Sequence, residues 1–442
     1  MKPIYLLLSF VFGAAVTIAQ PKPYSGVLNG NRFLTFNAII RVNQIEATRT
    51  LNLGEDERSL HTPQRVIAFR KAIEDGFPGA RITWALSWLA LHDTTANYVA
   101  IKMLVTKYHK QYGDEVTFIP GAYFSNAHNT RSQVNKDLHD GLAKVSAIVG
   151  NNYRPKCVVA GFLAAANQKY LATTENIHVC QGNIWSQYAI DNQDGEGSVV
   201  YPYYPSVDHF CKPAQSKTDL IDCVNLDGWT MDFLAARREG YADGFNSRLG
   251  VGPIETLGKY GETTGVREMI HTTAAHFDEG FKLNKFGWVT VNWEVSLDIP
   301  VSGLTEWLHQ IKKRWPQTQF ITMGEFGLTW RKAYKTNNFN YQFVQRGSGI
   351  GGSDKPMEIK WLMNKSFRLA LLRNWQTKSP WQVIDFTKYD GKIKEPDTLT
   401  RNWSILGTIN QKQTRAQDKP VSLSKLSPND IKLIRKHYPG FK

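Results

Sequence analysis

The sequence predicts an α/β protein, a (β/α)7–8 barrel followed by a small all-β, sandwich-like domain. Two observations lead to this. Strand-like apolar runs alternate with segments of helical periodicity eight times before about residue 340, and short strand-like runs separated by Asn, Gly, Lys and Pro follow. Regular strand–helix alternation is typical of a parallel sheet closed into a barrel, and an open doubly wound sheet is the alternative. We therefore assign 20–344 to the barrel and 345–442 to the C-terminal domain, joined by a linker at 345–355.

The expected strands are short, apolar and rich in β-branched residues. They cover 36–46, 81–91, 115–124, 157–162, 177–185, 219–228 and 288–294, with an eighth starting at 318. The helix after the first strand should begin at Pro63 with Thr62 as its N-cap. The alternation breaks at 186–218, and a loop of this length is usually a lid, a binding loop or an insertion.

Residues 1–19 have the pattern of a secretory signal peptide. Lys2 supplies the positive charge at the start, and an apolar run follows. Thr17, Ile18 and Ala19 then form the cleavage region. No later run is long and apolar enough to be a transmembrane segment. We therefore expect a secreted or periplasmic protein.

The charged residues and the cysteines of the sequence indicate which classes of partner to expect and which disulfide. The chain has 53 Lys+Arg against 39 Asp+Glu, a formal charge of +14, with the excess concentrated toward the C-terminus. This predicts either a solvated basic surface or attraction to anionic glycans. Export and the absence of a nucleic-acid motif argue against nucleic acid. Of the four cysteines, Cys211 and Cys223 are the expected disulfide, while Cys157 and Cys180 read as buried thiols.

No cofactor is predicted. The glycines at 349–352 do not make a phosphate-binding loop after a strand, so no nucleotide is expected. His271 and His276 are five residues apart and would not share a helix face. We therefore predict no metal site.

Acidic residues follow several of the expected strands. Glu294 and Glu325 end two consecutive strands, and Glu46 and Asp227 end two others. The carboxyl ends of parallel strands carry the active site in such folds, so these acids should share one rim. The alternative is that one or both glutamates cap a helix or pair with an arginine.

Two carboxylates at one rim suit glycoside hydrolysis, in which one acid is protonated and the other ionised. We assign Glu294 as general acid and Glu325 as nucleophile or base, with Glu46 and Asp227 as substitutes. Adjacent strands lie about 4.8 Å apart, a spacing that favours the retaining mechanism.

Polar and aromatic residues near the strand ends suggest a sugar site. Asn292 lies on the same strand face as Glu294, where it would bind a sugar hydroxyl or simply fill the interior. Indole rings stack on sugars, but they also pack in cores. The candidate platforms are Trp84, Trp88, Trp185, Trp229 and Trp293.

Residues 36–230 resemble the polysaccharide deacetylase (NodB-like) and glycoside hydrolase superfamily. The similarity rests on acids after the first strand, on Y-H-K-Q-Y-G-D-E-V-T-F (108–118), on Arg154-Pro155, and on Trp185-Ser186 with Asp191. The resemblance implies a barrel acting on an oligosaccharide or polysaccharide. The deacetylases hold a metal with an Asp and an H-x-x-x-H pair, whereas 121–130 contains His128 alone.

A second resemblance covers most of the chain. N-Q-I-E, I-T-W-A-L-S-W-L-A-L and H-F-C-K-P look like a family of exported bacterial proteins of unassigned function. This resemblance implies no activity. A deacetylase-like enzyme and a non-catalytic glycan-binding protein therefore remain alternatives to a glycoside hydrolase.

Overall fold

The computed structural model describes residues 22–150, 152–184, 186–187, 195–239, 249–296, 300–407 and 420–441. The expected signal peptide and Trp185 lie outside these ranges, so both stay predictions. Within them, no helix is both long and apolar enough to cross a bilayer.

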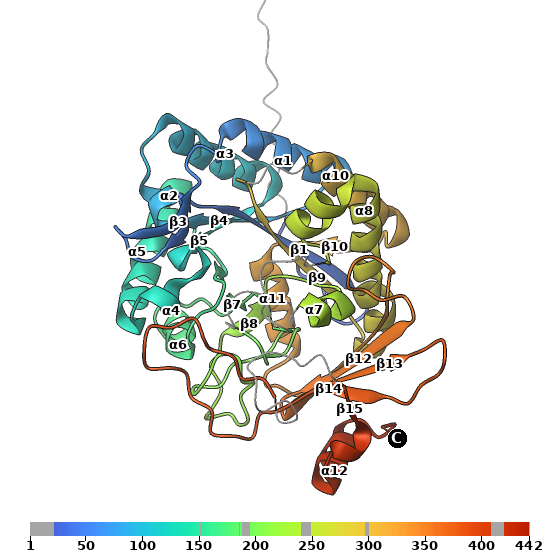
Figure 1. The fold of residues 1–442 in the computed structure, drawn as a ribbon. Coiled ribbons are helices and arrows are strands. Elements are labelled where there is room, and N and C mark those ends of the chain that lie inside the picture. The colour runs from blue at the N-terminus through green and yellow to red at the C-terminus, as the bar shows by residue number, and fades with distance from the viewer. Residues whose placement is uncertain are drawn as a thin grey trace, which may run out of the picture.

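A parallel sheet forms around the first strand, β1 (Arg32–Ile40), whose side chains are almost all buried. β9 (Gly287–Glu294) pairs with one edge of β1 along nearly its whole length. The other edge pairs with β4 (Thr83–Ser87), which in turn pairs with β5 (Glu115–Ile119). The short β10 (Gln319–Phe320) contacts only the beginning of β1, at Phe33 and Leu34 (Figure 1).

A second parallel sheet contains β6 (Val158–Val159), β7 (Val179–Asn183) and β8 (Val224–Asp227). Hydrogen bonds at both of its edges connect it to the first sheet. Thr117 Oγ1 donates to Cys157 O over 2.5 Å beside β5, and Thr230 N donates to Thr290 O over 3.0 Å beside β9. Seven strands thus follow one another in chain order and return to β1, which confirms the expected α/β architecture with parallel strands.

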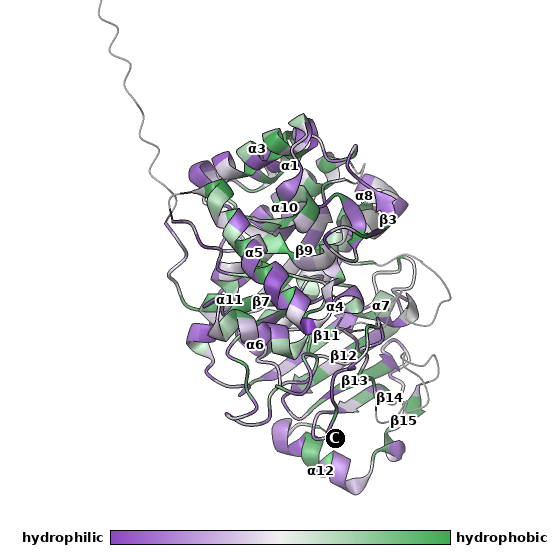
Figure 2. Cartoon of the chain, turned by 90° about the vertical axis from the view of Figure 1, so that its left-hand side faces the viewer, coloured by the Kyte–Doolittle hydropathy of each residue, from purple (hydrophilic) through white to green (hydrophobic). Residues whose placement is uncertain are grey.

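The helices cover the outside of these strands (Figure 1). The first begins as predicted, because Thr62 Oγ1 accepts from Arg65 N over 3.2 Å with Pro63 in the first turn. On α5 and α6, hydrophilic residues face outward (Figure 2). The helices are α1 (Pro63–Gly76), α2 (Trp88–His92), α3 (Ala96–Tyr112), α4 (Ser125–His128), α5 (Arg131–Val149), α6 (Ala165–Thr173), α7 (Phe233–Glu239), α8 (Lys259–Ala274), α9 (Phe281–Asn284), α10 (Val301–Arg314) and α11 (Met323–Ala333).

The C-terminal region is one antiparallel sheet with a helix, so the expected sandwich is wrong. Its elements are β11 (Asn340–Arg346), β12 (Met357–Asn364), β13 (Phe367–Asn374), β14 (Gln382–Lys388), β15 (Val421–Ser422) and α12 (Pro428–His437). One sheet face, including Phe343 and Trp361, joins the main core, while the other packs with α12. Of the expected linker at 345–355, the first two residues belong to β11 and the rest lie in the connection between β11 and β12, where Gly347 N donates to Met357 O over 3.0 Å.

The long loop after β7 and the cysteines prove to be buried. In the described part of the loop, Tyr201, Tyr203 and Tyr204 are each 1% exposed, so this part is not an open lid, while a binding loop and an insertion stay open as alternatives. All four cysteines are buried and none of them forms a disulfide in the structure, so the expected Cys211–Cys223 disulfide is absent.

Candidate functional site

Glu294 is the last residue of β9 and lies opposite Ile39, near the carboxyl end of β1. Arg41, immediately after β1, approaches it with Nη1 3.2 Å from Glu294 Oε1. The Arg41 side chain is 4% exposed and that of Glu294 is 23% exposed. A buried cation therefore holds a carboxylate that solvent or a ligand can still reach.

Glu57 binds the remaining nitrogen atoms of the Arg41 guanidinium. Arg41 Nε and Nη2 donate to its two oxygens over 2.8 and 2.6 Å, a bidentate geometry. Burial raises the pKa of Glu57, but hydrogen bonds from His61 and Arg41 outweigh it and lower the pKa to about 2. Arg41 thus binds two carboxylates: it makes a bidentate pair with Glu57 and a single contact with Glu294.

Asp227 ends β8 at the same rim. It accepts from Ser186 N and Trp229 N, each over 3.2 Å, and from the Ser186 hydroxyl. Burial raises its pKa to about 6, partly offset by these hydrogen bonds. Ser186 is itself held from the C-terminal sheet, because the buried Arg368 donates to Ser186 O over 2.5 Å.

Amide side chains from both parallel sheets meet beneath these acids. Asn37 Nδ2 donates to Gln181 Oε1 over 2.7 Å and to Asn292 Oδ1 over 2.9 Å. Gly228, next to Asp227, fits closely against them: a Cβ there would lie 2.5 Å from Asn292 Nδ2. Since Asn292 and Glu294 share one face of β9, Asp227 and Glu294 lie at the same end of neighbouring strands.

The Asn292 side chain is only partly satisfied. Its Oδ1 accepts from Asn37, while its Nδ2 is buried without a partner within the described structure, as is Asn37 Oδ1. Unpaired buried polar atoms are costly and concentrate at functional sites. The prediction that Asn292 binds a sugar hydroxyl stays open.

Glu325 does not share this rim, so the prediction that it pairs with Glu294 is wrong. β10 lies at residues 33–34 of β1, while Glu294 lies at residue 39, a separation of about 16 Å along the strand. Glu325 belongs to α11, where it completes a capping box with Thr322. Its carboxylate is 2.9 Å from Arg81 Nη2 and also accepts from Tyr24 N over 3.2 Å.

Glu46 lies near the rim but serves the backbone. It is in the hairpin of β2 (Asn43–Glu46) and β3 (Asn52–Asp56), beyond the end of β1. Its oxygens accept from the Ser87 hydroxyl and from Leu89 N over 3.2 Å, at the beginning of α2. Burial raises its pKa to about 7 against these hydrogen bonds. This carboxyl is 2% exposed and its described role is helix capping.

The tryptophans predicted as sugar platforms lie in different surroundings. Trp84 and Trp293 are 0% and 2% exposed and pack around Phe69, so their assignment as sugar platforms is wrong. Trp88 lies on the outer surface, stacked on His92 and under Arg49. Trp229 is 9% exposed and its backbone N donates to Asp227, so its assignment as a platform stays a prediction.

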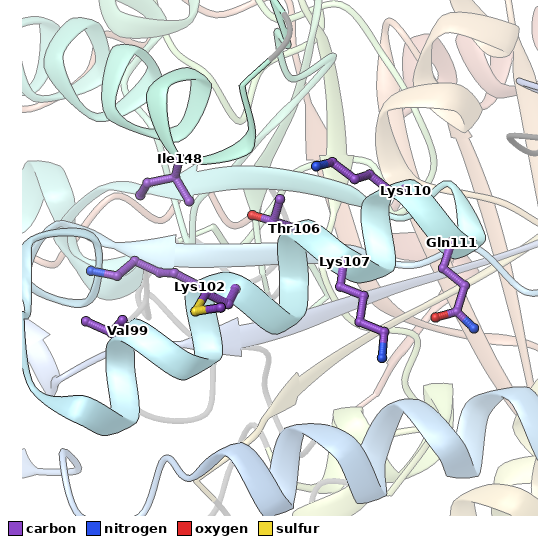
Figure 3. A pocket seen from close by; sticks show the side chains of 8 residues that line it. Val99, Lys102, Thr106, Lys107, Lys110, Gln111 and Ile148 are labelled. Atoms are coloured by element: carbon purple, nitrogen blue, oxygen red, sulfur yellow. The ribbon is translucent and has the colours of Figure 1, made fainter. Parts of the chain in front are cut away.

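Two hollows lined by described residues lie away from these acids. A shallow one of about 760 Å³ is lined by α3 and Ile148 of α5, with Lys102, Lys107 and Lys110 around it (Figure 3). A cavity of about 50 Å³ adjoins Glu325. Neither includes Glu294 or Asp227, so the site rests on side-chain geometry. Within the described ranges, no three His, Cys, Asp or Glu residues come together as a metal site.

Comparison with known proteins places the chain in a family. Residues 26–363 match DUF3863, a domain of unknown function with a solved structure, and residues 368–441 match the companion domain DUF3864. The chain belongs to this family. The boundary between the two matches falls in the turn between β12 and β13. No curated protein matches the chain in sequence.

The chain is similar to several solved structures, and the first of these supports the fold. A provisionally assigned glycoside hydrolase/deacetylase from Parabacteroides distasonis is 48% identical, with a TM-score of 0.88 over 93% of this chain and 99% of that one. A provisionally assigned polysaccharide deacetylase from Mycobacterium smegmatis is 14% identical, with a TM-score of 0.44 over 72% and 96%. A GH57 branching enzyme from Thermococcus kodakaraensis is 11% identical, with a TM-score of 0.37 over 64% and 69%.

Proposed function

We propose that this member of the DUF3863 family is an exported glycan-active hydrolase that cleaves a glycosidic bond with Glu294 and Asp227. The observation that carries the proposal is the difference between these two carboxyls. Glu294 lies 3.2 Å from a buried arginine, while Asp227 is buried without a cation within the described contacts and has a raised pKa. Glycosidases need one ionised and one protonated carboxyl at one bond.

The environments assign the roles. Asp227, with a pKa of about 6, is the general acid that protonates the leaving oxygen. Glu294, held by Arg41, is the ionised partner, either the nucleophile or the base that activates water. This reverses the role expected for Glu294 from the sequence, because the sequence did not reveal the arginine beside it.

Several features support a glycan as the substrate. The 48% identical relative is assigned, provisionally, as a glycoside hydrolase/deacetylase. Beside the two acids, Asn292 Nδ2 is an unpaired donor suited to a hydroxyl, and Trp229 adjoins Asp227. The charge of +14 favours an anionic glycan, and the signal-like residues 1–19 favour export.

The test is a screen of residues 20–442 against neutral, N-acetylated and uronic-acid-containing oligosaccharides, measuring new reducing ends and released acetate separately. We expect reducing ends, which Glu294→Gln and Asp227→Asn abolish without abolishing binding. Acetate without reducing ends would establish the deacetylase alternative. Binding with neither product would establish a glycan-binding protein.

A further inference from the structure

The turn after β5 holds Tyr123 in an unusual backbone conformation. Gly121, Ala122 and Tyr123 follow one another with φ of 61°, 47° and 90°. Only glycine adopts positive φ readily, and each non-glycine residue there costs on the order of 1 kcal/mol or more. Such strain persists where the surrounding structure enforces it, and it concentrates at functional sites.

Gly161, after β6, packs closely against Tyr123. Its N–H donates to Tyr123 O over 3.2 Å, and a Cβ on Gly161 would lie 2.7 Å from Tyr123 Cβ. The absence of a side chain at Gly161 therefore allows the two main-chain segments to pack closely at Tyr123. In the sequence, only the glycine at position 121 indicates this unusual turn.

The Tyr123 hydroxyl is buried and has no hydrogen-bond partner within the described structure, although the ring is 3% exposed. The charged groups acting on it are Glu294, Glu57 and Arg41, whose guanidinium carbon lies 5.9 Å from the ring centroid. Burial first, and then the charge of Glu294, raise the pKa of Tyr123 well above its ordinary value, so the hydroxyl remains a donor. Leaving such a donor unpaired costs about 1–3 kcal/mol.

We propose that Tyr123 is a positioning residue for Glu294, whose carboxylate turns from Arg41 to accept the Tyr123 hydroxyl. Glu294 can make this movement because its side chain is partly exposed and has one described ion-pair contact, at 3.2 Å. Arg41, by contrast, is fixed by two bonds to Glu57. The movement would satisfy the buried hydroxyl and give the carboxylate two defined orientations. The role in turnover rests on the proposed function, whereas the contact itself does not.

The contact can be measured without a substrate. In protein labelled with ¹³C at the glutamate carboxyls, the Glu294 signal is identified as the one missing from Glu294→Gln, and its titration is followed by NMR. A donated hydrogen bond favours the ionised form, so Tyr123→Phe should raise the midpoint by about 0.5–1 pH unit. An unchanged midpoint would overturn the proposal.

Tyr204→Phe is the matched control, because its buried ring carries a hydroxyl that donates to Tyr334 O over 2.8 Å. Tyr204→Phe should lower the melting temperature and leave the Glu294 midpoint unchanged. Tyr123→Phe should raise that midpoint whatever its effect on the melting temperature, since it removes a hydrogen bond to Glu294. If Tyr204→Phe shifts the midpoint as much as Tyr123→Phe does, the shift reflects general destabilisation and the proposal fails.

Kinetics then separate the two proposals. With a glycan that the wild type cleaves, Tyr123→Phe should lower kcat about 10-fold with KM nearly unchanged, because only the orientation of Glu294 is altered. Normal kcat would overturn the positioning role even if the NMR shift were present. If no glycan is cleaved, the proposed function fails, and the NMR titration alone decides whether the contact exists.

Discussion

Glu294 and Glu325 look alike in sequence, each following an apolar run, but they lie at opposite ends of the parallel sheet. Glu325 is 6% exposed in its side chain, with Arg81 at 2.9 Å and the backbone of Tyr24 and Thr322 as further donors. Glu294 is 23% exposed and has Arg41 alone among its described ion pairs. A carboxylate whose acceptors are all occupied stabilises the fold, whereas one with free acceptors can meet a ligand.

The polar groups around the two glutamates also differ. Around Glu325, capping and ion pairing satisfy the carboxylate, although Arg81 Nε is buried without a partner, and the described cavity is only about 50 Å³. Around Glu294, Tyr123 Oη, Asn292 Nδ2 and Asn37 Oδ1 are buried without partners within the described contacts. Such atoms also occur elsewhere in the described structure, but here three of them accompany a carboxylate that is partly exposed to solvent, so a ligand that reaches Glu294 could pair with them.

The largest effect that would sharpen this comparison is expected from Asp227→Asn. Removing the general acid should lower turnover by about 10²–10⁴-fold. Wild-type activity should fall as pH rises through about 6, the raised pKa of Asp227. The residual activity of the variant should not show this fall. A pH–rate profile checks it, and an unchanged profile would remove Asp227 from the reaction.

The next effect is on stability at the other end of the sheet. Glu325→Gln keeps a capping oxygen but leaves the buried Arg81 without its carboxylate. Breaking a buried pair on one side costs about 3–5 kcal/mol, so the free energy of unfolding should fall by about 3 kcal/mol. Urea unfolding measures it, with Glu294→Gln as the matched control. A larger loss in the control would contradict the comparison.

A smaller, pH-dependent effect is expected from Glu46→Gln. The folded pKa of Glu46 is about 7, above its ordinary value of 4.5, so the native state binds the proton more tightly and loses stability as pH rises from 4.5 to 7. Glutamine resembles the protonated acid. The variant should match the wild type below pH 4.5 and exceed it above pH 7, by at most about 3 kcal/mol. Denaturation at pH 4 and pH 8 checks the sign, and lower stability at pH 8 would contradict it.

The sequence predicted the fold well because the fold rests on local signals. Strand–helix alternation located the strands, and Thr62-Pro63 located the beginning of α1. The C-terminal region was less accessible, since short alternating strands do not reveal whether they form one sheet or two. Its packing against the main core depends on contacts distant in sequence, such as Arg368 with Ser186.

The site was predicted only in part, for identifiable reasons. The segment from Thr322 to Glu325 is a capping-box pattern, T-x-x-E, and this signal could have placed Glu325 at a helix start. Trp293 alternates with Asn292 and Glu294 along β9, so period-two reasoning could have placed it on the opposite, core-facing side. Arg41 and Tyr123 carry no local signal, because their roles depend on strands meeting in space.

The most direct test of the central claim is the turnover of Glu294→Gln and Glu325→Gln, measured side by side on an oligosaccharide that the wild type cleaves. Both variants must first be shown to be folded at the assay temperature. We expect Glu294→Gln to lose at least about 10³-fold in kcat, while folded Glu325→Gln stays within a few-fold of the wild type. Loss of activity in Glu325→Gln with Glu294→Gln unaffected would contradict the account and place the reaction at the amino end of the sheet.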